Sequence, residues 1–555
     1  MAELKPRSKF NQRFVELNNI QQQHVGKWKD IRDYQAPYRG NFIEDEGTQG
    51  SRKDLKIFNG TSGLSLRTIQ AGLRAGIASP SRVWFRLAMA DDELSERADV
   101  RDWLRQTETV LYRIFAKSNF YNEIALVFLE TPAFGQCPLS IVADNDTVAH
   151  FEAYTIGEYF IATNSKKQVD VLYRRIYKTA AQLIEEFGKE NVSQSVLNMG
   201  NGSGADQKVK IIHAVEPNDT RIPGMIDNKN KAYRSVYYEE DSKVDDNDFL
   251  SVSGFDTFPY AVPRWSVNGS DPYGTDQPGL VALGDAKQLQ NDTLEKAKGL
   301  RLNMRPPLQA TSDLRNARLV NIPGGVTFTN QFSGGGQGVR TLYENKVPLN
   351  DIRQDNLETE QRIRSAYYVD LFLAILSNNR PQDMKAEVAF QLDKERLEML
   401  GPALESFNND LLDPVIDRVF FLADQAGILP EAPEDLEGEG LKVGYVSSLA
   451  RAQKLSIIGN MERLFGLVGS VEQLIPGTID KLDGDQFVDE IGEVLGTPGK
   501  IIRSDEEVEE VRKAQAQSEA MNQALQASVA GAGAAKDLSQ AKVGQGSVLD
   551  SLVGS

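Results

Sequence analysis

The sequence has few of the residues that metal and disulfide sites need. Cys137 is the one cysteine among 555 residues, which excludes a disulfide within the chain and is typical of a reducing cytoplasm. The histidines His24, His150 and His213 are far apart, and none belongs to a Cys/His cluster with the spacing of a zinc site. We therefore expect no metal site and no intrachain disulfide.

Long apolar runs and an excess of basic residues are also missing. No run of about eighteen apolar residues occurs, and the first residues lack the apolar segment of a signal peptide, so no membrane span is expected. The formal net charge is −17, whereas proteins that grip DNA usually present a basic surface. Such acidity commonly serves solubility alone, and a repulsive tunnel through which a duplex slides is the alternative.

Catalytic motifs are incomplete wherever their letters occur. The loop Gly200–Ala205 matches a dinucleotide-binding pattern, but it does not lie between a strand and a helix. Gly334–Gly338 lacks the Lys-Ser/Thr of a phosphate-binding loop, and residues 483–485 lack the ligand spacing of an EF-hand. No Gly-x-Ser-x-Gly elbow is present. We expect no catalytic residues and no cofactor.

The first 270 residues predict helices around a twisted sheet. The expected helices are Phe10–Tyr34, Ser62–Ile77, Ala98–Lys117, Asn119–Pro132 and Ala180–Phe187. The expected strands are Gln136–Ile141, Phe151–Ala162, Val169–Tyr177, Val209–Val215 and Arg234–Tyr238. The candidate core residues of the first helix are Phe14, Leu17, Ile20, Val25, Trp28 and Ile31. Trp84 is expected to be a packed core aromatic rather than a base-stacking platform.

Residues 273–427 predict a helix, an insert, a second helix, a loop and a long third helix. Gly279–Arg305 is the first helix, and it stops at two prolines. The insert combines short strands with glycine-rich turns before the second helix, Asp351–Leu376. Met384–Ala426 would form a helix roughly 60 Å long. Kinks are expected at its prolines, Pro402 and Pro414.

The last part of the chain predicts a strand, Leu441–Val446, and then two or three helices up to Leu495. Ser504 and Glu507 form a capping box that opens another helix. From about Ala530 the composition is rich in Gly, Ala and Ser, and this tail is expected to be disordered when free. The fold class expected for the whole chain is α+β, mainly helical.

Several short motifs stand in a fixed order along the chain. They are Pro80-x-x-x-Trp84-Phe85, Asp271-Pro272-Tyr273-Gly274, Gly279 followed by Leu283-Gly284-Asp285 and Lys287-Gln288-Leu289-Gln290, Arg305-Pro306-Pro307-Leu308, and Tyr445 to Gln453. In this order and spacing the chain resembles the portal, or head-to-tail connector, proteins of tailed bacteriophages, most closely those of short-tailed podoviruses. The likeness covers roughly residues 10 to 515. Ser448 departs from it, since a proline is common at that place.

The resemblance implies a division of the chain into modules that build a ring. The implied modules are a wing (1–278), a stem helix (279–305), a clip (306–350), a second stem helix (351–376), a tunnel loop (377–385), a long kinked wing helix with a return strand (386–446), a crown (447–503), and a C-terminal helix with a flexible tail (504–555). The clip would dock the packaging motor and later the tail adaptor.

The resemblance also implies function, partners and location. A ring of about twelve subunits would stand at one capsid vertex of the virion, after assembly in the bacterial cytoplasm, and double-stranded DNA would pass through it during packaging and ejection. Its partners would be the terminase large subunit, scaffolding protein, major capsid protein, tail adaptor and internal core proteins, with no membrane and no enzymatic activity of its own. The alternative is another ring-forming phage structural protein, such as a tail adaptor.

Polar residues of the tunnel loop and the first stem helix are the candidates to line the DNA channel. Those of the loop are Asn378, Asn379, Arg380, Gln382 and Lys385, and those of the helix are Lys298, Arg301 and Arg305, with Lys287 and Lys296 beside them. A plain solvent-facing connection is the alternative for the loop. Salt bridges between subunits are the alternative for the helix.

Overall fold

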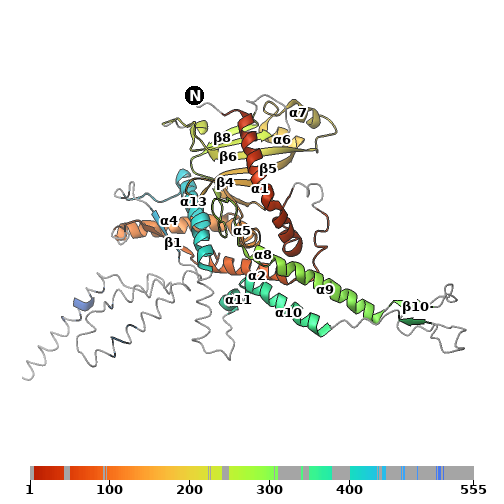
Figure 1. Ribbon diagram of the computed structural model, residues 1–555. Coiled ribbons are helices and arrows are strands. Elements are labelled where there is room, and N and C mark those ends of the chain that lie inside the picture. The colour runs from red at the N-terminus through yellow and green to blue at the C-terminus, as the bar shows by residue number, and fades with distance from the viewer. Residues whose placement is uncertain are drawn as a thin grey trace, which may run out of the picture. The chain divides into compact units, whose positions relative to one another are not determined.

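The computed structural model in Figure 1 divides into two compact units, Met1–Gln453 and Lys454–Ser555. Nearly all described residues belong to the first unit. The structure describes residues 5–42, 50–91, 94, 97–222, 224–225, 227–240, 249–305, 307–310, 339–341, 349–377, 400–433, 436 and 441–445, with scattered positions from 464 to 517. The predicted tunnel loop after Ser377, most of the clip and almost all of the crown lie outside the described residues.

Helices form most of the described chain. They are α1 (Arg7–Gln35), α2 (Thr61–Gly76), α4 (Ala98–Lys117), α5 (Phe120–Phe134), α6 (Ala180–Phe187), α7 (Gln194–Gly200), α8 (Pro278–Val281), α9 (Leu283–Met304), α10 (Leu349–Ala366), α11 (Val369–Ser377) and α13 (Asp413–Gln425). A short 3-10 turn, η2 (Asn228–Asn230), and a π-helical turn, η4 (Asn408–Leu412), complete the helical elements.

The strands pair antiparallel in two sheets and two ribbons. They are β1 (Phe85–Met89), β2 (Leu139–Asp144), β3 (Val148–Ala153), β4 (Tyr159–Thr163), β5 (Val169–Thr179), β6 (Lys208–Pro217), β7 (Tyr233–Glu239), β8 (Ser251–Phe255), β9 (Tyr260–Ala261), β10 (Leu308–Ala310), β11 (Val339–Thr341) and β12 (Leu441–Tyr445). The orders are β4-β5-β6-β7-β8, β3-β2-β9, β1-β12 and β10-β11. The expected α+β fold class is confirmed.

The five-stranded sheet is covered on both faces, because successive side chains of a strand point to opposite sides. On one face, Phe10, Phe14 and Leu17 of α1 pack with Ile212 of β6. On the other face, α6 and α7 pack on neighbouring residues such as Ile211. α1 therefore contributes its first half to this sheet, and its second half reaches the larger core that contains Trp28 and Ile31.

The connection between the sheets and the later helices is a set of very close backbone contacts. Gly135 ends α5 with φ of 97°, and a Cβ built on Gly274 would lie only 2.1 Å from the Gly135 carbonyl oxygen. A Cβ built on Gly279, in α8, would lie 2.2 Å from the Ala133 carbonyl oxygen. Real Cβ contacts are never so short, so only glycine fits at these two positions. Gly274 and Gly279 belong to the motifs that carry the family resemblance.

The expected helix Asp351–Leu376 is wrong in one respect, since two helices occupy this stretch. α10 ends at Ala366, and Tyr368 adopts a left-handed conformation with φ of 53° before α11 begins. α11 packs on α2, and a Cβ on Gly72 would lie 2.0 Å from the Phe372 ring. The packing of Phe372 on Gly72 and the burial of Tyr367 hold the chain in this bend. The left-handed conformation of Tyr368 costs backbone strain, because residues other than glycine rarely adopt it.

Other sequence-based expectations differ in detail. The expected strand Phe151–Ala162 is two strands, β3 and β4, with Gly157 at φ of 101° in the turn between them. Ile20 is exposed rather than part of the core. The strand β8 was not expected. The helix α5 continues past Pro132 to Phe134.

The expected kink at Pro414 coincides with the π-helical turn η4. A proline has no N–H, and its ring crowds the carbonyl four residues earlier, here that of Asp410. The turn widens instead, so that the N–H of Asp413 bonds to the carbonyl of Asn408. The chain is helical from Leu400 to Gln425. The other expected kink, at Gly401-Pro402, cannot be assigned, because residues 378–399 lie outside the described residues.

A buried carboxyl group lies where α5 meets the β3–β4 turn. Glu130 is 2% exposed, and it accepts hydrogen bonds from the Thr155 hydroxyl at 2.7 Å and the Ile156 N–H at 3.3 Å. Arg39 is 3.9 Å away. Burial raises the pKa of Glu130 to about 7, because the charged form loses its hydration, although the bond from Thr155 opposes the shift.

Substitution of Gly279 by alanine should destabilise the fold by about 1–3 kcal/mol, because the added methyl group overlaps the Ala133 carbonyl. Gly284→Ala, five residues later, is the matched control. A Cβ there would meet no atom within 4 Å, so this variant should be neutral or slightly more stable. Urea unfolding of the two variants measures the difference, and equal stabilities would contradict the close contact.

The pH dependence of stability should carry a contribution from Glu130. The pKa of the folded state lies above that of an unfolded glutamate, so the stabilisation is complete below about pH 4 and is lost as pH rises through about 7. Relative to Glu130→Gln, the wild type should therefore lose about 2–3 kcal/mol of unfolding free energy between pH 5 and pH 8. Glu185→Gln, on the exposed side of α6, should follow the wild-type curve. Parallel curves for wild type and Glu130→Gln would refute this assignment.

Candidate functional site

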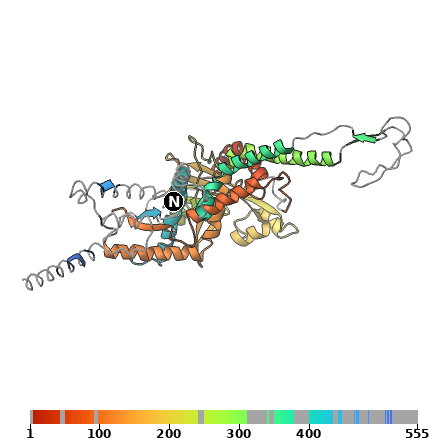
Figure 2. The ribbon, with the colours of Figure 1, turned by 90° about the horizontal axis from the view of Figure 1, so that it is seen from below.

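The helices α9 and α10 form a two-helix stem that points away from the five-stranded sheet in both views (Figures 1 and 2). They run antiparallel, and Arg362 pairs with Asp285 at 2.9 Å while Gln288 donates to Asp355 at 3.3 Å. Leu289 of α9 and Thr359 and Ile363 of α10 are buried in this half of the pair. We use the word stem for α9 and α10 together.

One buried amide holds both stem helices to the loop before α2. The side chain of Gln290 is 1% exposed, and its Oε1 accepts from the N–H groups of Phe58 at 2.6 Å and Asn59 at 2.7 Å. Its Nε2 donates to the Asn59 carbonyl at 2.8 Å. The Asn59 side chain in turn donates to Glu360 of α10 at 2.9 Å. The loop before α2 is therefore hydrogen-bonded to α9 through Gln290 and to α10 through Glu360.

A second buried amide, Gln35 at the end of α1, joins the segment before α9 to the residue after α10, at the base of the stem. Its Nε2 donates to the Gly279 carbonyl at 2.7 Å, and its Oε1 accepts from the Tyr367 hydroxyl. Burial raises the pKa of the Tyr367 phenol, so the hydroxyl keeps its proton and its role as donor. Nearby, Lys287 forms an ion pair with Asp30 of α1 at 2.6 Å. Lys287, one of the channel candidates, thus bonds within the chain.

The far half of α9 presents two different stripes. At about 100° per residue, Lys298, Arg301 and Arg305 follow one side of the helix, and Leu300 and Met304 follow another, roughly 110° away. Gly299 is buried, and at about 100° per residue it lies on the side of α9 that carries Asp285 and Gln288, which bond to α10. Leu300 is 39% and Met304 78% exposed, so this apolar stripe has no cover within the described part of the chain.

The structure places only some of the predicted channel residues. Lys298 pairs with Glu295 on its own helix at 2.7 Å. Arg301 and Arg305 are exposed and form no ion pair among the described residues. The tunnel-loop candidates lie outside the described residues; they are Asn378, Asn379, Arg380, Gln382 and Lys385.

Sequence reasoning missed the two amides that hold the stem. Gln290 lies on the stripe of Ala286 and Leu289, so a polar side chain on an otherwise apolar face was the available signal. Gln35 had no such signal, because it ends its helix and its partners, Gly279 and Tyr367, are far away in the sequence. Both amides are fully committed to hydrogen bonds, which suits a structural rather than a catalytic role.

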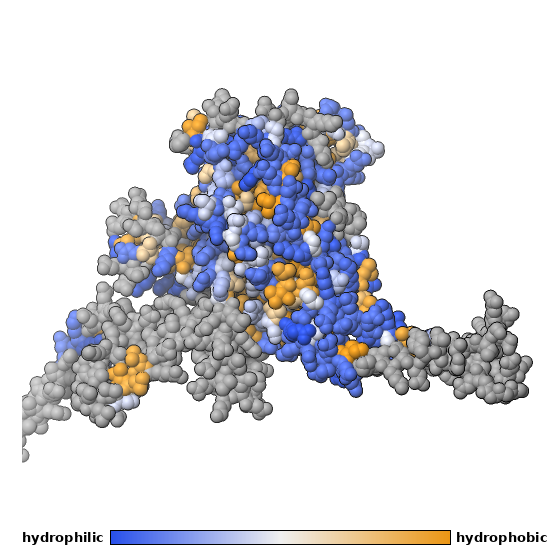
Figure 3. All heavy atoms as spheres, viewed as in Figure 1, coloured by the Kyte–Doolittle hydropathy of each residue, from blue (hydrophilic) through white to orange (hydrophobic). Residues whose placement is uncertain are grey.

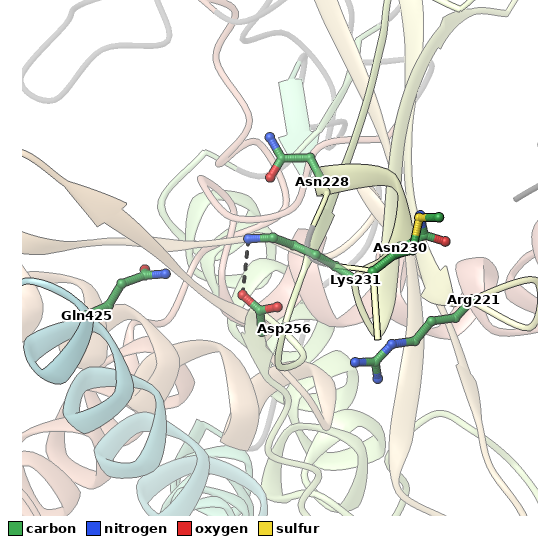
Figure 4. Close-up of a pocket in the computed structure, with 7 residues that line it drawn as sticks. Arg221, Asn228, Asn230, Lys231, Asp256 and Gln425 are labelled. Atoms are coloured by element: carbon green, nitrogen blue, oxygen red, sulfur yellow. Dashed lines mark ion pairs between the residues drawn. The ribbon is translucent and has the colours of Figure 1, made fainter. Parts of the chain in front are cut away.

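The surface of the described part of the chain carries an apolar patch and polar hollows. In Figure 3 most of the visible face is hydrophilic, with apolar colour over α8, where Val281 is 62% exposed. A polar hollow of about 320 Å³ lies beside η2 and the end of α13, where Lys231 pairs with Asp256 at 3.1 Å (Figure 4). Asp256, the one carboxylate among the described residues of the hollow, is held by this ion pair, and Arg221, Asn228, Asn230 and Gln425 complete the polar lining.

Buried titratable groups are structural as well. His213 bonds to the Ser235 hydroxyl at 2.9 Å and stacks on Tyr237, and burial lowers the pKa of His213 to about 3. Cys137 is buried, which raises the pKa of its thiol. Among the residues that the structure describes, no group of His, Cys, Asp and Glu could hold a metal ion. None of the described helices is long and apolar enough to cross a membrane.

Comparison with known proteins places the stem and its surroundings in a family. The model of the family "Bacteriophage head to tail connecting protein" matches residues 7–502. A probable portal protein of Bordetella phage BPP-1 is 35% identical over 525 residues, which is 94% of this chain and 94% of that protein. The portal protein of Salmonella phage epsilon15 is 34% identical over 552 residues, which is 100% of this chain and 98% of that protein.

Among solved structures, the neck of an empty GTA particle is similar over 78% of this chain and 90% of that chain, with 11% identity and a TM-score of 0.32. The match to the family model spans most of the chain, and both phage proteins are covered almost completely. The resemblance noted from the sequence motifs is therefore confirmed. The chain belongs to the family of bacteriophage head to tail connecting proteins.

Proposed function

We propose that the chain is a structural portal protein, which forms a homo-oligomeric ring at one capsid vertex of a phage particle. The observation that carries this proposal is the similarity, over nearly the full length, to two phage proteins named portal or probable portal. The ring serves as the conduit for double-stranded DNA during packaging and ejection. It is a connector without enzymatic activity, and the nucleotide chemistry belongs to the motor.

The geometry of the stem supports a ring. A helix in a closed ring meets its own partner helix on one side, a neighbouring copy on another and the axis on a third. The far half of α9 offers three matching surfaces: Gly299 toward α10, the apolar stripe of Leu300 and Met304, and the basic stripe of Lys298, Arg301 and Arg305. We assign the apolar stripe to the neighbouring copy and the basic stripe to the channel.

The remaining modules complete the proposal. Residues 1–278 form the wing, 306–350 the clip, 377–385 the tunnel loop, 386–446 the long wing helix with its return strand, 447–503 the crown, and 504–555 the C-terminal helix and tail. The clip receives the terminase large subunit and later the tail adaptor. Scaffolding protein, the major capsid protein and internal core proteins are further partners. The ring holds about twelve subunits, and polar tunnel-loop residues contact phosphates transiently as DNA passes.

Ring formation should depend on the apolar stripe. Replacing Leu300 and Met304 together by glutamate places charges where a neighbouring copy packs, so the ring should dissociate into folded subunits. Both side chains are exposed in the single subunit, so its thermal unfolding should barely change. Native mass spectrometry and end-on electron microscopy measure the outcome.

The control for this experiment is Asn303→Glu, which adds charge on the same turn outside the stripe and should leave rings intact. Rings that persist in the Leu300/Met304 variant would show that the stripe is not an interface. A wild-type protein that stays a monomer even with its scaffolding partner would refute the ring itself.

The basic stripe should matter for DNA rather than for assembly. Reversing Lys298, Arg301 and Arg305 to glutamate would turn the proposed channel wall repulsive at short range, so rings should form while nuclease-protected DNA per particle falls. Lys296→Glu, on a different side of α9, is the control with the same kind of charge change. Normal packaging by the triple variant would rule out this stripe as the channel wall.

A further inference from the structure

Side chains close the sheet edges of the wing. An edge strand otherwise offers unpaired N–H and C=O groups to any other chain, which invites unwanted pairing. On the outer sides of β3 and β4, polar side chains from α1, α5 and the segment before α8 take up these groups. The bonds join Asn119 to Phe151 and Glu123 to Ala153 on β3, and Gln21 to Tyr159 and Tyr273 to Ile161 on β4.

The strand β1 is closed in the same way by α4. The Tyr112 hydroxyl accepts from the N–H groups of Trp84 at 3.0 Å and Phe85 at 2.9 Å, and it donates to the Phe85 carbonyl at 2.8 Å. Glu108 accepts from the Leu87 N–H at 2.8 Å. The backbone groups of Phe85 and Leu87 therefore point away from β12 and toward α4.

This arrangement fixes which backbone groups of β12 face outward. Leu87 stands opposite Val443, and Phe85 stands opposite Tyr445. In an antiparallel pair, two opposed residues either bond to each other or both point away from each other. Since Leu87 and Phe85 point away, so do Val443 and Tyr445, and the N–H and C=O groups of these two residues face the outer side of β12.

The outer edge of β12 is open in the part of the chain that is described. No hydrogen bond among the described residues engages the backbone N–H of Val443 or Tyr445. The edge strand β8 differs, because η2 covers it so closely that a Cβ on Gly254 would lie 2.7 Å from the Asn228 carbonyl oxygen. β12 is thus a described edge whose outward N–H groups have no hydrogen-bond partner in this part of the chain.

We propose that the outer edge of β12 binds an extended segment of a second copy of this chain, which adds a third strand to the β1–β12 ribbon. Backbone hydrogen bonds would supply the affinity, as in other cases of strand addition. Charge favours the same partner. Arg86 and Lys442 are exposed on one face of the ribbon, where they can pair with acidic side chains of an incoming segment, and Asp and Glu outnumber Lys and Arg in this chain by 79 to 62.

The choice of a second copy as the partner of β12 rests on the proposed function, a closed ring of identical subunits. A head-to-tail contact between identical copies either closes into a ring or grows without limit. In a closed ring the edge of every subunit is occupied by the next subunit, so no edge remains to recruit further chains. The outer edge of β12 can therefore lack a cover within the subunit, because the next subunit covers it in the ring. No such neighbour is proposed for β1, β3 and β4, so side chains of the same subunit close these strands against unwanted pairing.

Hydrogen exchange on the wild-type protein tests the proposal without any substitution. Lys442 and Gly444 stand opposite Ala88 and Arg86 and bond to β1 in every state, so their amides should exchange equally in rings and in unassembled subunits. The amides of Val443 and Tyr445 should be protected in rings alone. Equal exchange of Val443 in both forms would overturn the proposal.

A pair of substitutions tests the same edge by affinity. Val443→Pro removes the outward N–H and keeps the ladder to β1 intact, and it also trims a side chain that packs on the core. Val443→Thr keeps that N–H and a β-branched shape, so it is the matched control. The proline variant should need about tenfold more protein for half-maximal ring assembly, as loss of one hydrogen bond implies, with thermal unfolding of the subunit close to that of the threonine variant.

The outcomes separate the two proposals. If the proline and threonine variants form rings equally well, the edge proposal is overturned while the ring stands. If the wild-type protein forms no rings under any condition, the proposed function fails, and the edge proposal fails with it. If the proline variant does not fold, the exchange of Val443 in wild-type rings decides.

Discussion

The stem depends on two places where backbone touches backbone with no room for a side chain. Gly274 lies against Gly135, and Gly279 lies against Ala133, so the end of α5 and the start of α8 behave as one rigid piece. Gln35 then bonds to the Gly279 carbonyl at that contact and to Tyr367, the residue that directly follows α10. Without the glycine contacts, the amide would not reach both partners, and the direction of the stem relative to α1 would be free.

Much of the fold could be predicted from local patterns. α4 and α6 have the bounds that the sequence indicated, and α6 begins with a capping box in which Thr179 and Gln182 bond reciprocally. Such elements are specified by nearby residues. The break at Tyr368 could not be predicted, because a tyrosine has no preference for the left-handed region, and distant contacts of Phe372 and Tyr367 impose it.

The candidate site was predictable in outline only. The motif residues Gly274 and Gly279 were noticed for their resemblance to a family, and the structure supplies the physical reason why each must be glycine. Gln35 could not be predicted, because its hydrogen bonds to segments hundreds of residues away leave no periodic trace, whereas Gln290 on the apolar stripe of α9 was a signal that went unused. The basic residues of α9 were named from charge alone, and their separation from the apolar stripe became clear only once the buried side of the helix was known.

The pairing of β1 with β12 has a consequence for how the protein is made. The two strands are separated by roughly 350 residues of chain, so at typical translation speeds β1 waits about half a minute on the ribosome before its partner emerges. During that time α4 already closes one side of β1, because it follows directly in the sequence. The surface that β12 offers comes into existence only when synthesis is well advanced. Under the proposed contact through the outer edge of β12, nascent chains on one messenger would join through this strand only after most of each chain has been synthesised.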